Sequence, residues 1–221
     1  MKVDTYWARD EEYHLPYFRK VTRKIIQTYA LTGRRRHDPK EEKYANGIYW
    51  SRQWEYPFAA GQIGTPDKAR VLDVGCGTSP FLVYLGQNQY RAYGSDPGLE
   101  GPDGLWGHDE NFGAPHIIEI RRESMSSLSW EDDYFDYVTC LSVLEHIESS
   151  KEVVAGVEGM KRVLKPGGKL LLTVDDVGNG IRSAMLAIGV FTEGCRFEGH
   201  FDWEAPETKY PYSILSVTME K

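Results

Sequence analysis

The chain has 221 residues, of which 41% are hydrophobic, and its formal net charge is −7. This size and composition predict one folded domain, alone or with an arm, and exclude an intrinsically disordered chain. No apolar run approaches the roughly 20 residues of a membrane-spanning helix. The first residues lack the apolar stretch of a secretion signal and the three cysteines lack metal-like spacing, so we expect a cytoplasmic protein without a membrane partner.

The charge is spread unevenly along the sequence. Residues 1–52 carry 12 Lys and Arg against 7 Asp and Glu, and the remaining residues carry 14 against 26. The basic segment is expected either to fold back on the acidic remainder or to help hold an anionic substrate. Because an acidic body is a poor general binder of nucleic acid, no nucleic-acid partner is expected.

Residues 1–64 are expected to form an N-terminal helical arm. A helix is predicted from Pro16 to about Ala30, because its apolar residues repeat along one helix face. A second helix is predicted to begin after Ser51, its expected N-cap, and to end before Gly64.

From residue 65 to residue 221, strand-like and helix-like segments alternate. Such alternation predicts an α/β domain with a doubly wound, mostly parallel sheet and helices on both faces. The expected strands lie at residues 69–74, 91–95, 116–120, 134–141, 169–174, 196–201 and 213–220, and the expected helices at residues 79–87, 151–164 and 181–191.

A glycine turn follows the first of these strands. Asp73, Gly75 and Gly77 form an Asp-x-Gly-x-Gly pattern, and the next strand runs into Asp96, 23 residues after Asp73. Glycines let a backbone approach a ligand closely, and an acid about 20 residues further on is placed to bind ribose hydroxyls. The pattern therefore predicts an adenosine-type cofactor, and Pro80, at the position of a third glycine, disfavours a dinucleotide.

Four motifs follow one another along the chain over about residues 69–175. They are Val71–Thr78, the acid Asp96, Phe135–Val138 with Val143–Ile147, and Met160–Leu170. Together they resemble the Rossmann-like (class I) S-adenosylmethionine-dependent methyltransferases. The resemblance implies S-adenosyl-L-methionine as the cofactor and seven strands in the order 3-2-1-4-5-7-6, with strand 7 antiparallel. Residues 214–219 would be strand 7, inserted between strands 5 and 6.

The resemblance also implies the residues of a cofactor site. Asp73, Gly75 and Gly77 would line the methionine part, with Cys76 in the same turn as a small filler rather than a nucleophile. Asp96 would bind the ribose. Ser124 and Met125 would lie beside the adenine, where the family often has an acid that this chain lacks and that Glu123 would replace. Leu141 and Ser142 would lie near the methionine and the transferred methyl group.

A hydroxyl acceptor needs a general base, and the loops at the carboxyl ends of the strands contain four candidates. They are His146, Asp175, Asp176 and His200. Paired acids after strand 5 are typical of some metal-dependent methyltransferases, but those families also carry an acid after strand 4. Here that position reads Leu141-Ser142, so no metal is expected and the pair is expected to face the acceptor or to cap the next helix.

The arm supplies the candidate acceptor site. Trp50 and Trp54 are expected to stack on an acceptor, and Arg52 is expected to bind the cofactor's carboxylate. The alternative is that the aromatic side chains simply pack the arm on the sheet, because aromatic side chains bury large areas.

The preferred function is methylation of a small molecule or a sugar- or lipid-linked metabolite, at oxygen before nitrogen, by a monomer or homodimer. Three alternatives stay open. They are methylation of a protein or nucleic acid, a non-catalytic module that binds S-adenosylmethionine, and a dinucleotide-dependent dehydrogenase.

Overall fold

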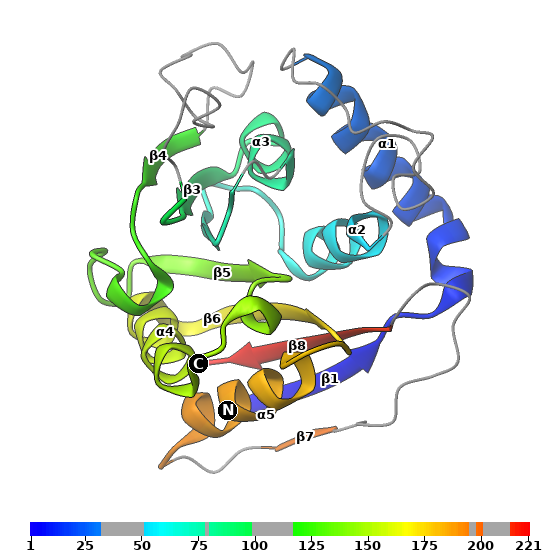
Figure 1. Ribbon diagram of the computed structural model, residues 1–221. Coiled ribbons are helices and arrows are strands. Elements are labelled where there is room, and N and C mark those ends of the chain that lie inside the picture. Colours follow the sequence, from blue (N-terminus) through cyan, green and yellow to red (C-terminus); the bar gives the residue numbers. More distant parts are fainter. Residues whose placement is uncertain (32–50, 78–79, 99–116, 195–197, 201–212) are drawn as a thin grey trace.

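A mixed sheet lies at the centre of the computed structural model (Figure 1), which describes residues 1–31, 51–77, 80–98, 117–194, 198–200 and 213–221. Across these residues the sheet has eight strands in the order β4-β3-β2-β5-β6-β8-β1-β7. The strands are β1 (Lys2–Trp7), β2 (Arg70–Val74), β3 (Arg91–Ser95), β4 (Ile117–Arg121), β5 (Phe135–Leu141), β6 (Leu164–Asp175), β7 (Glu198–His200) and β8 (Ile214–Glu220).

The strands from β4 to β6 are parallel, and β8 is antiparallel to both of its neighbours, β6 and β1. This arrangement confirms the predicted doubly wound, mostly parallel sheet in which the last strand is the antiparallel one. One detail differs from the expectation. The place beyond β8 belongs to β1 from the N-terminus, and β7, from the segment expected there, pairs outside β1.

Strand β1 also changes the predicted division at residue 64. Its six residues pair with β8 from Lys2 opposite Glu220 to Trp7 opposite Leu215. Val3, Thr5 and Trp7 are buried and alternate with more exposed residues, as in a strand with one face on the core. Residues 2–7 are therefore part of the sheet and not of a helical arm.

Helices cover both faces of the sheet. Residues of α1 (Pro16–Leu31), α2 (Arg52–Gln62) and α3 (Pro80–Gln87) share a core with Leu171 of β6, whereas α4 (Ser150–Val163) and α5 (Gly180–Thr192) pack with Leu170 and Leu172. Successive side chains of a strand point to opposite faces, so the two groups of helices lie on opposite sides. Three short 3-10 helices complete the described elements: η1 (Asp10–His14), η3 (Met125–Ser127) and η4 (Leu144–His146).

The predicted boundaries of α1 and α2 are confirmed, but the capping bond of Ser51 is not. Ser51 precedes α2 in a helical conformation, and its side chain makes no capping hydrogen bond. Inside α2, Pro57 has no N–H to donate to the carbonyl of Gln53. The hydroxyl of Thr22 in α1 donates to that carbonyl instead, at 3.3 Å, and so joins the two helices.

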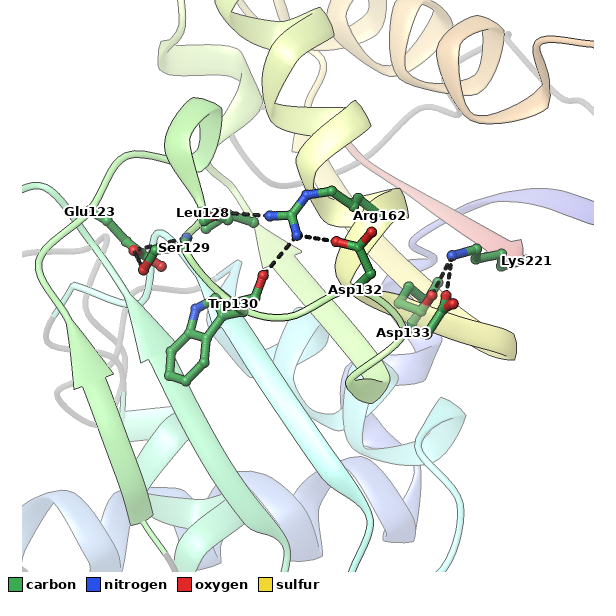
Figure 2. A network of polar contacts seen from close by, with 9 residues as sticks. Glu123, Leu128, Ser129, Trp130, Asp132, Asp133, Arg162 and Lys221 are labelled. Atoms are coloured by element: carbon green, nitrogen blue, oxygen red, sulfur yellow. Dashed lines mark hydrogen bonds and ion pairs between the residues drawn. The ribbon is translucent and has the colours of Figure 1, made fainter.

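Arg162 of α4 holds the loop that leads from β4 to β5 (Figure 2). Its guanidinium donates to the carbonyls of Leu128 and Trp130, at 2.6 and 2.7 Å, and to Asp132 Oδ1 at 2.6 Å. This contact gives a structural reason for the arginine in the Met160–Leu170 motif.

None of the helices within the described residues is both long enough and apolar enough to cross a bilayer.

Candidate functional site

The glycine turn lies where β2 ends. Gly75 has φ +71° and Gly77 has φ +43°, and the amides of Gly75 and Cys76 donate to the carbonyl of Ser95 at 2.8 and 3.1 Å. A Cβ atom on Gly75 would lie 2.5 Å from Val143 Cγ2. Glycine is required at position 75 both for the positive φ and for this close approach. The turn after β2 is therefore packed directly against the turn after β5.

Asp96 lies beside the same turn. Its Oδ2 accepts a hydrogen bond from the amide of Gly77 at 2.9 Å, and its Oδ1 accepts one from Gly98 at 2.7 Å. Each carboxylate oxygen can accept more than one bond, so Asp96 keeps acceptor capacity for hydroxyl groups. The structure brings Asp96 and the glycine turn together, and the binding of ribose stays a prediction.

Asp73 is buried at the end of β2. Its Oδ1 accepts a hydrogen bond from Thr139 Oγ1 at 2.7 Å. Burial raises the pKa of Asp73 to about 7, although Thr139 and Arg52 both favour the charged form. The backbone of Cys76 is part of the glycine turn, whereas its thiol is buried in the core. Burial raises the pKa of this thiol. A buried, protonated thiol is a filler and not a nucleophile.

Sequence reasoning missed Glu55, which comes from α2 and is completely buried. Its Oε1 accepts hydrogen bonds from Ser142 Oγ at 2.5 Å and Thr173 Oγ1 at 2.7 Å, and its Oε2 is paired with Arg52. Ser142 has φ +50°, and its amide donates to the carbonyl of Thr173 at 3.0 Å. The carboxylate of Glu55, which comes from a helix outside the sheet, therefore lies at the carboxyl ends of β5 and β6. The sequence gives no signal for it, because it depends on how α2 packs.

Glu145 is the second acid that sequence reasoning passed over. The hydroxyl of Ser142 lies close to it but donates to Glu55, so both oxygens of Glu145 are buried without a hydrogen-bond partner among the described residues. Burial raises the pKa of Glu145 to about 7, the charge of Glu55 adds to the rise, and Arg52 opposes it. The neighbouring His146, predicted as a base, is exposed. Glu145 therefore fits a general base better than His146 does.

The other predicted bases are not brought together. Asp175 is buried at the end of β6, close enough for its charge to raise the pKa of Arg52. Asp176 accepts a hydrogen bond from the amide of Ser213 at 2.9 Å and so fixes the start of β8 instead of facing an acceptor. His200 belongs to β7, at the edge of the sheet, and three strands separate it from β5. Its backbone position does not bring it to the glycine turn.

The arm does not present the predicted acceptor site. Trp54 is completely buried between Tyr6 and Phe58, and its Nε1 donates to Glu12 at 3.0 Å. The prediction that it stacks on an acceptor is wrong, because none of its surface is exposed. For Trp54 the structure agrees with the alternative, in which aromatic side chains pack the arm on the sheet. Trp50 lies outside the described residues, and Arg52, with 24% of its side chain exposed, pairs with Glu55.

The residues predicted beside the adenine are divided between core and surface. Met125 is buried against α4, where a Cβ atom on Gly156 would lie 2.1 Å from its Cε. Ser124 accepts a hydrogen bond from the amide of Ser126. Glu123 accepts two bonds from Ser129, beside the Arg162 network in Figure 2. Its Oε1 is buried without a partner among the described residues. Contact of these side chains with an adenine stays a prediction.

Negative charge dominates this edge of the sheet. Among the described residues, four buried acids, Glu55, Asp73, Glu145 and Asp175, lie around the single guanidinium of Arg52. Burying a charge is costly unless an opposite charge compensates for it. The site therefore suits a ligand with positive charge. No group of three His, Cys, Asp or Glu within the described residues is arranged to hold a metal ion.

Comparison with known proteins gives one family. Residues 41–207 match a family model described as a methyltransferase domain. Over 109 residues the chain is 36% identical to the ubiquinone biosynthesis O-methyltransferase of Xanthomonas oryzae pv. oryzae, covering 48% of this chain and 42% of the relative. Over 134 residues it is 28% identical to the tRNA U34 carboxymethyltransferase of Hydrogenovibrio crunogenus, covering 57% and 39%. The matches span less than half the length of these two curated relatives.

The fold is also similar to a solved structure that holds a demethylated cofactor. This is the Burkholderia thailandensis 1,6-didemethyltoxoflavin-N1-methyltransferase with bound 1,6-didemethyltoxoflavin and S-adenosylhomocysteine. The TM-score is 0.59 at 17% identity, and the match covers 97% of this chain and 91% of that one. At this identity the likeness concerns the fold.

Proposed function

The chain belongs to the methyltransferase-domain family, and we propose that it methylates a small molecule or a sugar- or lipid-linked metabolite, at oxygen. Its cofactor is S-adenosylmethionine. The observation that carries the proposal is the approach of Gly75 to Val143, with Asp96 bonded to Gly77 at the same edge. Two turns and a carboxylate meet there, at the carboxyl ends of parallel strands, where ligands of open α/β sheets bind.

The residues present fit this cofactor. When bound, S-adenosylmethionine supplies an activated methyl group on a positively charged sulfur. Asp73 and Glu145 are buried acids, and burial raises the pKa of each to about 7, so a cationic ligand would stabilise their charged forms. Gly75 and Gly77 would hold the methionine part, and Asp96 the ribose. Arg52 would bind the carboxylate.

We assign the role of general base to Glu145. Its pKa of about 7 suits a group that must accept a proton near neutral pH, and its oxygens have no hydrogen-bond partner in the described residues. It would take the proton of the acceptor hydroxyl, while the packed turns hold the reacting groups in line and exclude water. Asp175 is also buried, and its charge raises the pKa of Arg52. It is the second candidate for the general base.

The substrate class rests on two supports. One similar protein is named as an O-methyltransferase of ubiquinone biosynthesis, and residues 53–221 carry an excess of 12 negative charges, which disfavours nucleic acid. The relative that modifies tRNA makes RNA methylation the alternative to test.

The test follows a labelled methyl group. The protein is incubated with S-adenosylmethionine carrying a radioactive methyl group and with three separate fractions of a cell extract: molecules below about 1 kDa with extracted lipids, total RNA, and protein. We expect label in the first fraction. Label only in RNA or protein would support the alternative, and binding of the cofactor without any transfer would indicate a non-catalytic module.

A further inference from the structure

We propose that Glu55 of α2 is a positioning residue of the cofactor site, which fixes the Ser142 turn and the guanidinium of Arg52. The inference rests on the proposed function, because it concerns the same site. Glu55 is completely buried, and a buried carboxylate is tolerated only when donors compensate for its lost hydration. Ser142, Thr173 and Arg52 supply them from three different elements. Glu55 therefore joins α2 to the turn after β5 and to β6.

The Ser142 turn needs such a support. Ser142 has φ +50°, a conformation that is costly for a residue other than glycine and persists only where the surroundings enforce it. Its amide donates to the carbonyl and to the Oγ1 of Thr173, at 3.0 and 3.1 Å. Its hydroxyl donates to Glu55. Glu55 is thus the acceptor that fixes the side chain of the strained residue.

The effect reaches the glycine turn through direct contact. Val143 follows Ser142 in the chain. A Cβ atom placed on Gly75 would lie 2.5 Å from Cγ2 of Val143. If Ser142 loses its acceptor, Val143 is free to shift relative to Gly75. The path from Glu55 to the turn that holds the cofactor is therefore two residues long, Ser142 and Val143.

Arg52 is the second group that Glu55 fixes. The two residues are three apart on α2 and form an ion pair, so Glu55 restricts the side-chain freedom of Arg52. This places the guanidinium at the carboxyl edge, beside Asp73 and Asp175. A guanidinium held in this way loses less conformational entropy when it binds a carboxylate.

A double-mutant cycle on the full chain tests the inference. Glu55→Gln keeps an acceptor oxygen and loses the charge, and Ser142→Ala removes the hydroxyl. Titration calorimetry measures the Kd of S-adenosylhomocysteine, and turnover gives KM and kcat. We expect each single variant to raise Kd and the KM for S-adenosylmethionine at least about tenfold, with kcat changed less. The double variant should be weaker than either single variant but by less than the product of their effects.

Glu12→Gln is the matched control. Glu12 also accepts three hydrogen bonds, from Tyr6, Arg9 and Trp54, but none comes from the turns at the sheet edge. It should lower Tm and leave Kd unchanged. If Glu55→Gln does not fold, Thr173→Val takes its place, because it removes one donor and keeps the charge, and it should raise Kd about threefold or more.

Two results would overturn the inference. In the first, Glu55→Gln and Ser142→Ala lower Tm but bind S-adenosylhomocysteine as tightly as the wild type, as Glu12→Gln should. In the second, their effects on Kd multiply. A wild type that binds neither S-adenosylmethionine nor its product would instead contradict the proposed function.

Discussion

Gly75 and Val143 approach so closely that no side chain fits between the turns after β2 and β5. Gly75→Ala must therefore displace Val143, and it must also adopt φ +71°, which costs a residue with a Cβ about 1–3 kcal/mol. We expect the Kd of S-adenosylmethionine to rise more than tenfold in calorimetry.

Gly167→Ala separates strain from contact in that experiment. Gly167 has φ +76°, but a Cβ atom there would meet nothing within 4 Å. It should lower Tm and leave Kd unchanged. Equal losses of affinity in both variants would mean that general destabilisation, and not the contact with Val143, explains the effect.

Asp96→Ala should weaken binding of both S-adenosylmethionine and S-adenosylhomocysteine by about 1–2 kcal/mol, because charge-assisted hydrogen bonds to the ribose are lost. The variant also loses the bond from Gly77. Asp96→Asn keeps an acceptor oxygen for it and should have a smaller effect. Asp67→Ala, which removes an exposed acid elsewhere, is the control for net charge. Undiminished affinity in Asp96→Ala would rule out the ribose assignment.

The kcat/KM of methyl transfer reports the free enzyme and should increase with pH through about 7, because Glu145 accepts a proton only when it is ionised and burial raises its pKa to about 7. Glu145→Gln should lower kcat at least about 100-fold and abolish that rise. Asp73, whose pKa is also about 7, still titrates in this variant, so a rise that persists would assign the pH dependence to Asp73.

Stability should respond to pH in the opposite direction. Below the pKa of an unfolded-state glutamate, about 4.3, Glu145 is protonated in both states and has no pH-dependent effect. Between that value and about 7 the unfolded state releases the proton first, so stability is lost as the pH rises. The loss is up to about 4 kcal/mol. In thermal unfolding, the Tm of Glu145→Gln relative to that of the wild type should increase between pH 5 and pH 8. A constant difference in Tm would contradict the assigned pKa.

Arg162→Met should destabilise the protein without weakening cofactor binding. It leaves the carbonyls of Leu128 and Trp130 without their donor (Figure 2), which costs about 1–3 kcal/mol. For a chain of this size, that corresponds to a fall in Tm of roughly 2–12 °C. Arg182→Met removes an arginine whose contact with Ser150 is exposed, and should change Tm little. A loss of affinity in Arg162→Met would mean that the loop contributes to the site.

The alternation of strands and helices and the glycine turn were predictable from the sequence, because both depend on residues close together in the chain. Strand β1 was missed because six alternating residues near the N-terminus become a strand only by pairing with β8, more than 200 residues later. Glu55 and Glu145 were missed, and Trp54 was misread, for a related reason. Their burial follows from the packing of α2 and the turn after β5, which no local pattern records.

The most direct test is a crystal structure with S-adenosylhomocysteine bound. We predict that its amino-acid part lies against residues 75–77 and 141–143 and that its ribose hydroxyls are bonded to Asp96. A structure in which this edge of the sheet remains closed by side chains, or in which the ligand binds elsewhere, would contradict the account.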